Sequence, residues 1–261
     1  MNKNRIFIAL ATLMLFSSGV ALFAAPTGQQ VMENVYNRPS GEDMSADLIM
    51  TLTNSRGSSR ERSITQYRLD TGEAEKKLMF FLAPADVKDT SFMNWSYDDD
   101  RDDDQWIYLP ALRRVKRISS DSKNDSFMGS DFTYDDLGER HPSEDRHRVL
   151  REEKLRGEQC YVIESIPTGN DDAFSKTISW ITADTWIGLK REYYDQEGKV
   201  YKTLTIEEYE QIDGYWVITN MIMEDLKREH TTRMAMENVK FDTGMTDSLF
   251  SERQMQRGPR R

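Results

Sequence analysis

The residues best suited to chemistry in this chain form two clusters rich in acids. The first runs from Asp98 to Asp104 and holds six aspartates around Arg101. Clustered carboxylates are ligands that calcium prefers. When the calcium-loop spacing is laid on the run from Asp98, however, Asp103 falls where glycine is needed and Leu109 where a bidentate acid belongs. The run is therefore interpreted as a solvated hairpin tip, and no metal site is predicted.

The second cluster joins histidines and acids over a short stretch, containing Glu139, His141, Glu144, Asp145 and His147. It lacks the HExxH spacing of zinc sites, so a charged surface segment is the better interpretation. The sequence also lacks a GxSxG motif and a glycine-rich phosphate loop. We therefore expect no enzymatic activity, no cofactor and no metal.

Four basic residues stand close together in a chain that is otherwise acidic: Arg113, Arg114, Lys116 and Arg117. Arginine binds phosphate and carboxylate through two parallel hydrogen bonds. The quartet is therefore a candidate contact for an anionic head group or an acidic partner. Internal ion pairs with Asp98–Asp104 or with Asp131–Asp136 are the alternative, because these acids lie near in sequence.

The first residues have the pattern of a secretory signal. Lys3 and Arg5 precede an apolar run from Ile6 to Phe16, and small residues follow up to Ala25. The run is about 11 residues long, too short to span a bilayer. Residues 1–25 are therefore predicted to be a signal peptide cleaved near positions 21–25, and the mature protein is expected in the periplasm of a Gram-negative cell.

Composition excludes some classes of partner. The chain has 35 Lys and Arg against 45 Asp and Glu, a formal net charge of −10, which argues against nucleic-acid binding. Cys160 is the single cysteine, so no internal disulfide can form. It opens the strand-like run Cys160–Ile163, and a buried, unreactive thiol is expected.

Alternation with a period of two dominates the chain. Apolar residues alternate with polar ones in about a dozen runs, separated by turn signals such as Asp213-Gly214. Short connections imply antiparallel neighbours, and a long twisted meander tends to curl. We predict a mainly β fold: one curled antiparallel sheet with a few covering helices, forming a single domain over residues 26–261.

Helical patterns are few. Residues 27–36 carry an apolar stripe, and Thr246 can cap a short helix over 247–253. The stretch from Ser119 to Arg156 lacks a strand pattern, and a helical or turn-rich cover is expected there.

Three segments carry a resemblance to a known family: Phe81–Val87, Gln105–Ile118 with its QWIYLPALRRVKRI sequence, and Phe127–Leu137, which reads FMGSDFTYDDL. They are similar to the LolA-like family of outer-membrane lipoprotein-sorting proteins. The resemblance implies an unclosed half-barrel of the LolA or LppX kind, with helices as a lid and acyl chains held between. It also implies transient membrane contact, with an RND-type inner-membrane exporter as a partner.

From the alternation and the resemblance together, we expect a periplasmic carrier that moves the acyl chains of a lipoprotein or lipid toward the outer membrane. A ligand-sensing regulator of the same fold and an accessory subunit of an RND-type exporter are the alternatives. The expected cavity lining consists of apolar residues from several strands: Leu48, Met50, Leu52, Phe80, Leu82, Met93, Trp95, Trp106, Tyr108, Met221, Met223, Met234 and Met236.

Overall fold

The computed structural model describes residues 25–99, 101–169 and 173–259. The predicted signal segment therefore lies almost wholly outside the described residues. The chain begins with helix α1 (Gly28–Tyr36), and its strands follow in a meander. The first six strands are β1 (Asp43–Thr53), β2 (Ser59–Asp70), β3 (Ala74–Ala83), β4 (Ser91–Tyr97), β5 (Asp104–Leu109) and β6 (Arg114–Arg117).

The remaining strands follow a connecting segment, residues 118–144, that contains an isolated β-bridge between Ser126 and Thr133 and four short 3-10 turns: Ser120–Ser122, Phe127–Gly129, Asp135–Leu137 and Pro142–Glu144. They are β7 (Asp145–Leu155), β8 (Glu158–Pro167), β9 (Lys176–Thr182), β10 (Gly188–Tyr194), β11 (Val200–Ile212), β12 (Tyr215–Asp225) and β13 (His230–Phe241). A 3-10 turn (Asp247–Leu249) and helix α2 (Glu252–Arg257) end the described chain.

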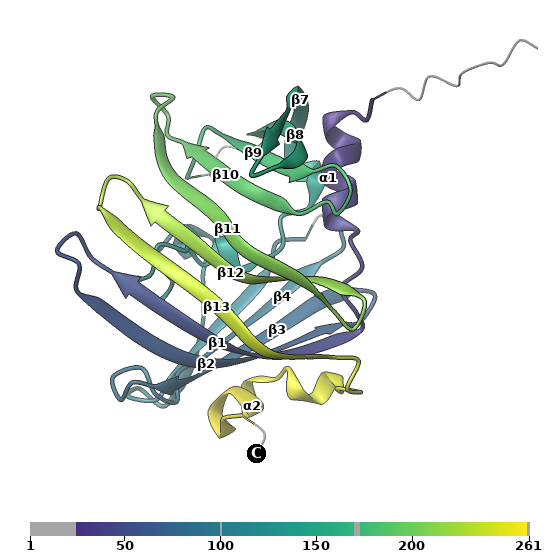
Figure 1. The fold of residues 1–261 in the computed structure, drawn as a ribbon. Coiled ribbons are helices and arrows are strands. Elements are labelled where there is room, and N and C mark those ends of the chain that lie inside the picture. The colour runs from purple at the N-terminus through teal and green to yellow at the C-terminus, as the bar shows by residue number, and fades with distance from the viewer. Residues whose placement is uncertain (1–24, 100, 170–172, 260–261) are drawn as a thin grey trace, which may run out of the picture.

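All thirteen strands form one antiparallel sheet in the order β6-β5-β4-β3-β2-β1-β13-β12-β11-β10-β9-β8-β7. The sheet curls without closing, because β6 and β7 remain separate edges (Figure 1). The predicted fold class is thereby confirmed. The first strand, β1, and the last strand, β13, pair with each other in the middle of the sheet, where Met50 lies opposite Met234.

The inner face of the curled sheet is largely filled by the connecting segment, here called the plug (residues 118–144). Its aromatic side chains Phe127 and Phe132 are buried in the largest apolar cluster, together with residues from both halves of the sheet: Leu48, Met50, Leu52, Ile64, Met79, Phe81, Phe92, Tyr193, Met223 and Met234. The expected turn-rich cover is thus present over 119–144. The expectation was wrong for residues 145–155, which form strand β7.

The outer face of β2–β6 is covered by the C-terminal segment. Leu249, Phe250 and Met255 pack against Leu78, Phe80 and neighbouring side chains of this face. Figure 1 shows α2 beneath the sheet, on the side away from the plug. The C-terminal helix begins at Glu252 and ends at Arg257, further along the chain than predicted, because Asp247–Leu249 forms a 3-10 turn instead.

Candidate functional site

A cavity of about 340 Å³ remains on the inner face, between α1, the plug and strands β10–β12. Its apolar walls come from all three sources: Met32 and Val35 of α1, Phe132 of the plug, Phe174 and Tyr193 near β10, and Leu204, Met221 and Met223 of β11 and β12. The volume lies within the range of about 300–1,000 Å³ that is usual for small-molecule sites.

Helix α1 forms one wall of this cavity because its sequence fixes where it begins and how closely it packs. The Thr27 hydroxyl accepts a hydrogen bond from the backbone N–H of Gln30 at 3.2 Å. The backbone N–H of Thr27 in turn donates to Oε1 of Gln30 at 2.9 Å. Val31 is fully buried against Ile163 and Ile181. Gly28 sits so close to β7 that a Cβ would lie 2.7 Å from the backbone of His147 and Arg148.

The plug is pinned to the sheet by two aspartates of the Phe127–Leu137 motif. Asp131 is fully buried, accepts from the Thr232 hydroxyl at 2.7 Å and lies 2.7 Å from Nδ1 of His230. Asp136 forms an ion pair with Lys202 at 2.8 Å and also accepts from Tyr193 at 3.3 Å. The motif therefore holds the plug against β10–β13.

Further bonds hold the plug to the other half of the sheet through its own carbonyl groups. Arg62 donates to the carbonyl of Met128, Gln105 to that of Tyr134 and Lys77 to that of Leu137, over 2.6, 2.8 and 3.0 Å. The Phe127–Leu137 motif therefore has a structural role, because it fixes the plug that forms part of the cavity wall.

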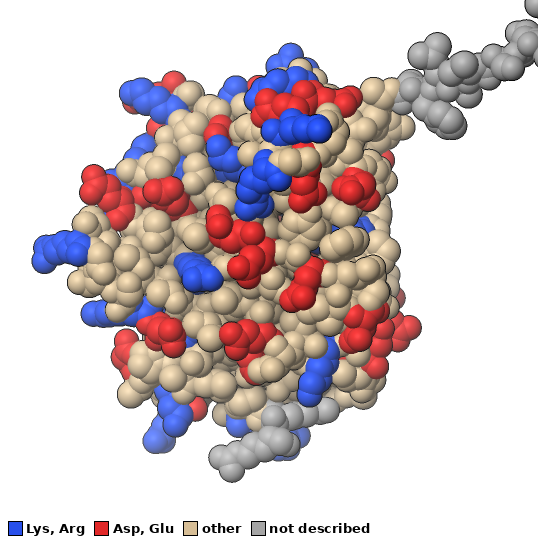
Figure 2. All heavy atoms as spheres, viewed as in Figure 1, with Lys and Arg blue, Asp and Glu red and all other residues tan. Residues whose placement is uncertain are grey.

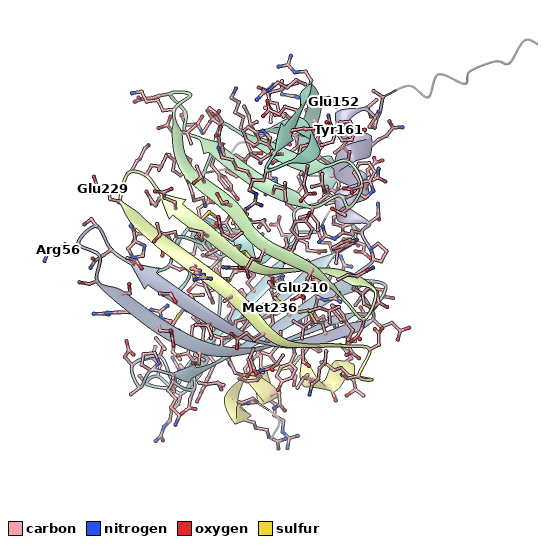
Figure 3. All side chains as sticks on the ribbon, viewed as in Figure 1. Arg56, Glu152, Tyr161, Glu210, Glu229 and Met236 are labelled. Carbon is pink, nitrogen blue, oxygen red and sulfur yellow. The ribbon has the colours of Figure 1, made fainter. Side chains whose placement is uncertain are left out.

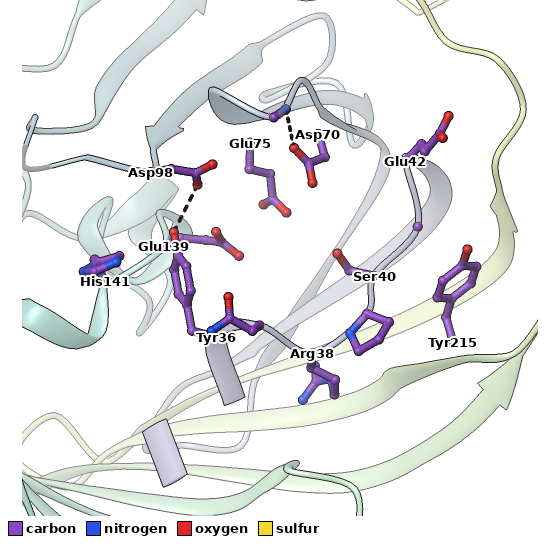
Figure 4. A pocket seen from close by; sticks show the side chains of 14 residues that line it. Tyr36, Arg38, Ser40, Glu42, Asp70, Glu75, Asp98, Glu139, His141 and Tyr215 are labelled. Atoms are coloured by element: carbon purple, nitrogen blue, oxygen red, sulfur yellow. Dashed lines mark hydrogen bonds between the residues drawn. The ribbon is translucent and has the colours of Figure 1, made fainter. Parts of the chain in front are cut away.

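A second, more open hollow of about 890 Å³ lies where α1 leads into β1, and we call it the mouth. Figure 4 shows that acids from several elements line it, namely Glu42, Asp70, Glu75, Asp98 and Glu139, with the carboxylate of Glu42 pointing outward. The Tyr36 hydroxyl bonds Asp98 at 3.2 Å. Tyr36, Arg38 and Glu139 line both the mouth and the apolar cavity, so the two hollows adjoin.

Two carboxylates near this junction have raised pKa values. Glu139 is exposed and lines both hollows, yet desolvation by the surrounding protein raises its pKa to about 7, with the charge of Glu75 adding to the effect. Desolvation also raises the pKa of Asp135 to about 6. Burial lowers the pKa of Arg38, which donates to the carbonyl of Trp186 at 3.1 Å.

The thirteen residues expected to line a cavity are divided between the two faces of the sheet. Seven lie on the inner face with the plug: Leu48, Met50, Leu52, Met221, Met223, Met234 and Met236. Of these, only Met221 and Met223 line the cavity. Phe80, Met93, Trp95, Trp106 and Tyr108 lie on the outer face under the C-terminal segment, and Leu82 is 39% exposed. The two groups cannot line one cavity.

The basic quartet is exposed on and beside β6, at one edge of the sheet. Arg117 forms an ion pair with Asp104. Within the described residues, the side chains of Arg113, Arg114 and Lys116 form no ion pair. The alternative of internal pairing therefore accounts for one member of the quartet.

The other candidate clusters take structural positions. The acidic run lies at the connection between β4 and β5, where Asp98, Asp99 and Asp102 are exposed as the hairpin-tip interpretation predicted. Asp103 differs, because it accepts from the Ser96 hydroxyl at 2.8 Å and desolvation raises its pKa. His147 bonds Ser165 at 2.7 Å and the carbonyl of Pro142 at 2.9 Å. No group of three or more histidine, cysteine or acidic residues suited to a metal occurs in the part of the chain that the structure describes. Cys160 is buried, as expected.

Several lining residues were missed by sequence reasoning. Leu204 lies in β11, but alternation along a strand does not tell which face meets the cavity. Phe132 belongs to the Phe127–Leu137 motif, and Met32 and Val35 to the recognised stripe of α1. The motif and the stripe were therefore the available signals. No sequence signal pointed to Glu139, because its environment is formed by segments that are far apart in the sequence.

Comparison with known proteins places this architecture in a family. A solved structure of a putative outer membrane lipoprotein-sorting protein domain from Vibrio parahaemolyticus is 35% identical, with a TM-score of 0.83, and the match covers 88% of this chain and 98% of that one. The chain belongs to the LolA-like family of outer-membrane lipoprotein-sorting proteins. A family model described as an uncharacterized protein matches residues 73–257.

Two further structures agree with the LolA-like assignment. A DUF1329 family protein from Desulfovibrio piger is 31% identical over 88% of this chain and 98% of its own, with a TM-score of 0.83. A LolA superfamily protein from Nitrosomonas europaea, 18% identical, shares the fold with a TM-score of 0.68 over 88% of this chain and all of its own. No curated protein matches the sequence significantly.

Proposed function

We propose that this LolA-like protein is a carrier that holds the acyl chains of a lipid or lipoprotein and passes them toward the outer membrane. The observation that supports this most is the apolar cavity on the inner face, which opens beside a polar mouth. An amphiphile fits such a pair of hollows, with its chain in the cavity and its head group toward the mouth. Each buried methylene contributes about 0.8 kcal/mol, so a single chain supplies ample driving force.

The cavity as it stands is smaller than the inner face, because the plug occupies most of that face. A long chain would therefore require α1 or the plug to move outward. Helix α1 is the better candidate for this movement. It rests on the edge strand β7 and its neighbour β8, whereas the plug is bonded to both halves of the sheet. In this proposal α1 is the lid and the plug is the fixed floor.

The test compares two methionines on the same face of the sheet. Both Met221 and Met236 are partly buried against the inner cluster, but only Met221 lines the cavity. After removal of bound lipid, Met221→Trp should reduce uptake of a fluorescent fatty acid at least tenfold, while Met236→Trp should leave it within about twofold. Met223→Trp, at a second lining position, should behave like Met221→Trp.

Two results would count against the carrier. Wild-type protein that takes up no fatty acid after delipidation has no usable cavity. Equal loss of uptake in Met221→Trp and Met236→Trp, each with a lowered melting temperature, would mean that the substitutions act through the core.

We further propose that the carrier works in the periplasm after loss of its first 21–25 residues, with an RND-type exporter as its donor. The basis for export and cleavage is the charged and apolar pattern of residues 1–25, and the exporter is proposed only because the resemblance to the LolA-like family implies it. None of the helices among the described residues is long and apolar enough to cross a membrane. Intact mass of protein from the periplasmic fraction tests the cleavage, and full-length protein in the membrane fraction would contradict it.

A further inference from the structure

The sheet has two chemically different ends. The turns β1–β2, β3–β4, β5–β6, β10–β11 and β12–β13 all lie at one end, as the strand registers require, and we call it the hairpin end. The mouth lies at the other end, roughly 35 Å away for strands of this length. Arg56 and Glu229, labelled at the left of Figure 3, mark two turns of the hairpin end.

The exposed large apolar residues of the described chain all lie at the hairpin end. They are Leu82, 39% exposed at the end of β3, Leu226, 43% exposed between β12 and β13, and Leu112, 64% exposed between β5 and β6. Single exposed leucines are ordinary on protein surfaces. Three on separate hairpins at one end, with none at the other end among the described residues, indicate that this end meets an apolar environment.

The turn of Leu112 is built to hold this side chain outward. Pro110 ends β5, the Leu112 N–H donates to the carbonyl of Leu109 at 3.0 Å, and the Arg113 N–H donates to that of Pro110 at 3.1 Å. Arg113 adopts a positive φ of 51°, which closes the turn. The apolar side chain is thus presented by an ordered backbone.

Unpaired cations surround this leucine. The exposed side chains of Arg113 and Arg114 form no ion pair within the described residues. Arg113 and Arg257 of α2 also line a hollow of about 600 Å³ beside the turn, with Tyr108 and one acid, Asp89. Two guanidinium groups at the rim of a hollow suit a phosphate, which arginine binds bidentately.

The end of the sheet that carries the mouth is acidic, and this difference between the two ends would orient the molecule at an anionic membrane. The mouth is lined by five carboxylates, and Asp98–Asp104 lies at the same end. Figure 2 shows basic side chains projecting at the left, over the hairpin end, with acidic side chains among them, and a group of acidic side chains at the right margin. A chain of net charge −10 is repelled by an anionic membrane as a whole, so it can approach one only with the hairpin end first.

We propose that the hairpin end docks on an anionic membrane surface, with Leu112 entering the interfacial layer and Arg113 and Arg114 contacting lipid phosphates. A protein partner fits less well, because protein interfaces have a contiguous apolar core, whereas these leucines stand on separate turns. The inference concerns a surface remote from the mouth. It does not depend on what the cavity holds, and it is tested on cargo-free protein.

The first test measures sedimentation of the purified protein with vesicles of phosphatidylcholine, with and without phosphatidylglycerol. Binding should require phosphatidylglycerol and weaken as salt is added. Arg114→Gln should lower the partition coefficient about fivefold and Leu112→Ser about tenfold. The matched control, Lys154→Gln, removes one exposed cation near the β7–β8 turn at the other end and should change nothing.

The second test reads the orientation directly. Because Cys160 is buried, a thiol introduced by Leu112→Cys can be labelled selectively with a polarity-sensitive dye. Its emission should shift to the blue with phosphatidylglycerol vesicles, while the same dye at Lys154→Cys should not respond. Absence of vesicle binding by the wild type, equal binding without phosphatidylglycerol, or equal responses at both labels would each overturn the proposal. Normal fatty-acid uptake in these variants would show that such a failure leaves the carrier proposal intact.

Discussion

At the scale of single residues, buried carboxylates decide how the inner face is built. Asp131 and Asp136 are five positions apart in one motif, yet they reach different strands and hold one segment at two points. A buried carboxylate is costly unless it is bonded or paired. Oδ2 of Asp131 receives both bonds, whereas Oδ1 has no hydrogen bond within the described residues and lies 3.6 Å from the guanidinium group of Arg228. The aspartates of the Phe127–Leu137 motif are therefore structural ties, and their contribution can be measured.

Replacing Asp131 by alanine should be costly. The change leaves Thr232 and His230 without their buried acceptor, so the free energy of unfolding should fall by about 3 kcal/mol. Urea denaturation measures this loss. Asp121→Ala, at an exposed position of the same plug, should stay within about 0.5 kcal/mol of the wild type. Equal effects of the two changes would show that Asp131 is not a tie.

Glu139 should make stability depend on pH. In the unfolded chain its carboxyl group titrates near the ordinary value of 4.5, while in the folded protein its pKa is about 7. Between these values the folded state binds more protons, so its contribution to stability falls as pH rises from about 4.5 to 7 and is constant above. The cause is desolvation, opposed by Lys77 and Arg68.

It follows that Glu139→Gln should raise the melting temperature relative to wild type at pH 8 more than at pH 5. Melting curves across this range provide the measurement. The control is Glu237→Gln, which removes an exposed carboxylate of β13. A wild-type and Glu139→Gln difference that does not change with pH would contradict the assigned environment of Glu139.

At the scale of elements, the packing of helix α1 against β7 can be altered by adding a single methyl group. A Cβ at Gly28 would lie 2.7 Å from backbone atoms of β7, and backbone atoms have little freedom to yield. Gly28→Ala should therefore displace the start of α1, at a cost of about 1–3 kcal/mol. Amide hydrogens of α1 should exchange faster, and fatty-acid uptake should rise if α1 is the lid. Asn34→Ala, on the exposed side of the helix, is the control.

Strands were largely predictable because a half-buried strand alternates in sequence, and α1 was found through its stripe and cap. Strand β7 was missed because it is an edge strand with few buried side chains and a bulge between Val149 and Arg151. Alternation also could not tell the inner face from the outer one. In β3 both Phe80 and Phe81 are buried, one under the C-terminal segment and the other against the plug.

The cavity could be predicted only in part for the same reason. The C-terminal segment covers an outer face that would otherwise be polar, so apolar residues occur on both sides of β3–β5. Which side holds a ligand then depends on where residues 245–257 pack, a long-range contact without a local signal in the strands. Met221 and Met223 lie together on the inner face and line the cavity, whereas Trp216 and Ile218 of the same strand pack in a different apolar cluster.

At the scale of the whole molecule, the two halves of the sheet should unfold together. They share the β1–β13 pairing, and Phe127 and Phe132 of the plug belong to a cluster that contains side chains of both. The tryptophans report on each half: Trp95 and Trp106 in the first, and Trp180, Trp186 and Trp216 in the second.

Urea curves followed by fluorescence should therefore coincide for two variants. One keeps only the tryptophans of the first half, and the other keeps only those of the second, with phenylalanine at the replaced positions. Curves with separate midpoints, after correction for the effect of each set of replacements on stability by circular dichroism, would instead divide residues 26–261 into two domains.

The position of β13 in the middle of the sheet also has a consequence for the timing of synthesis. Strand β1 is made early, but its partner on one side is the last strand of the chain, about 190 residues later. Until β13 emerges, β1 and β12 each present a bare edge that another chain can pair with. A message truncated anywhere before β13 should thus yield an aggregating product, and a chaperone that protects strand edges would matter most during the final moments of synthesis.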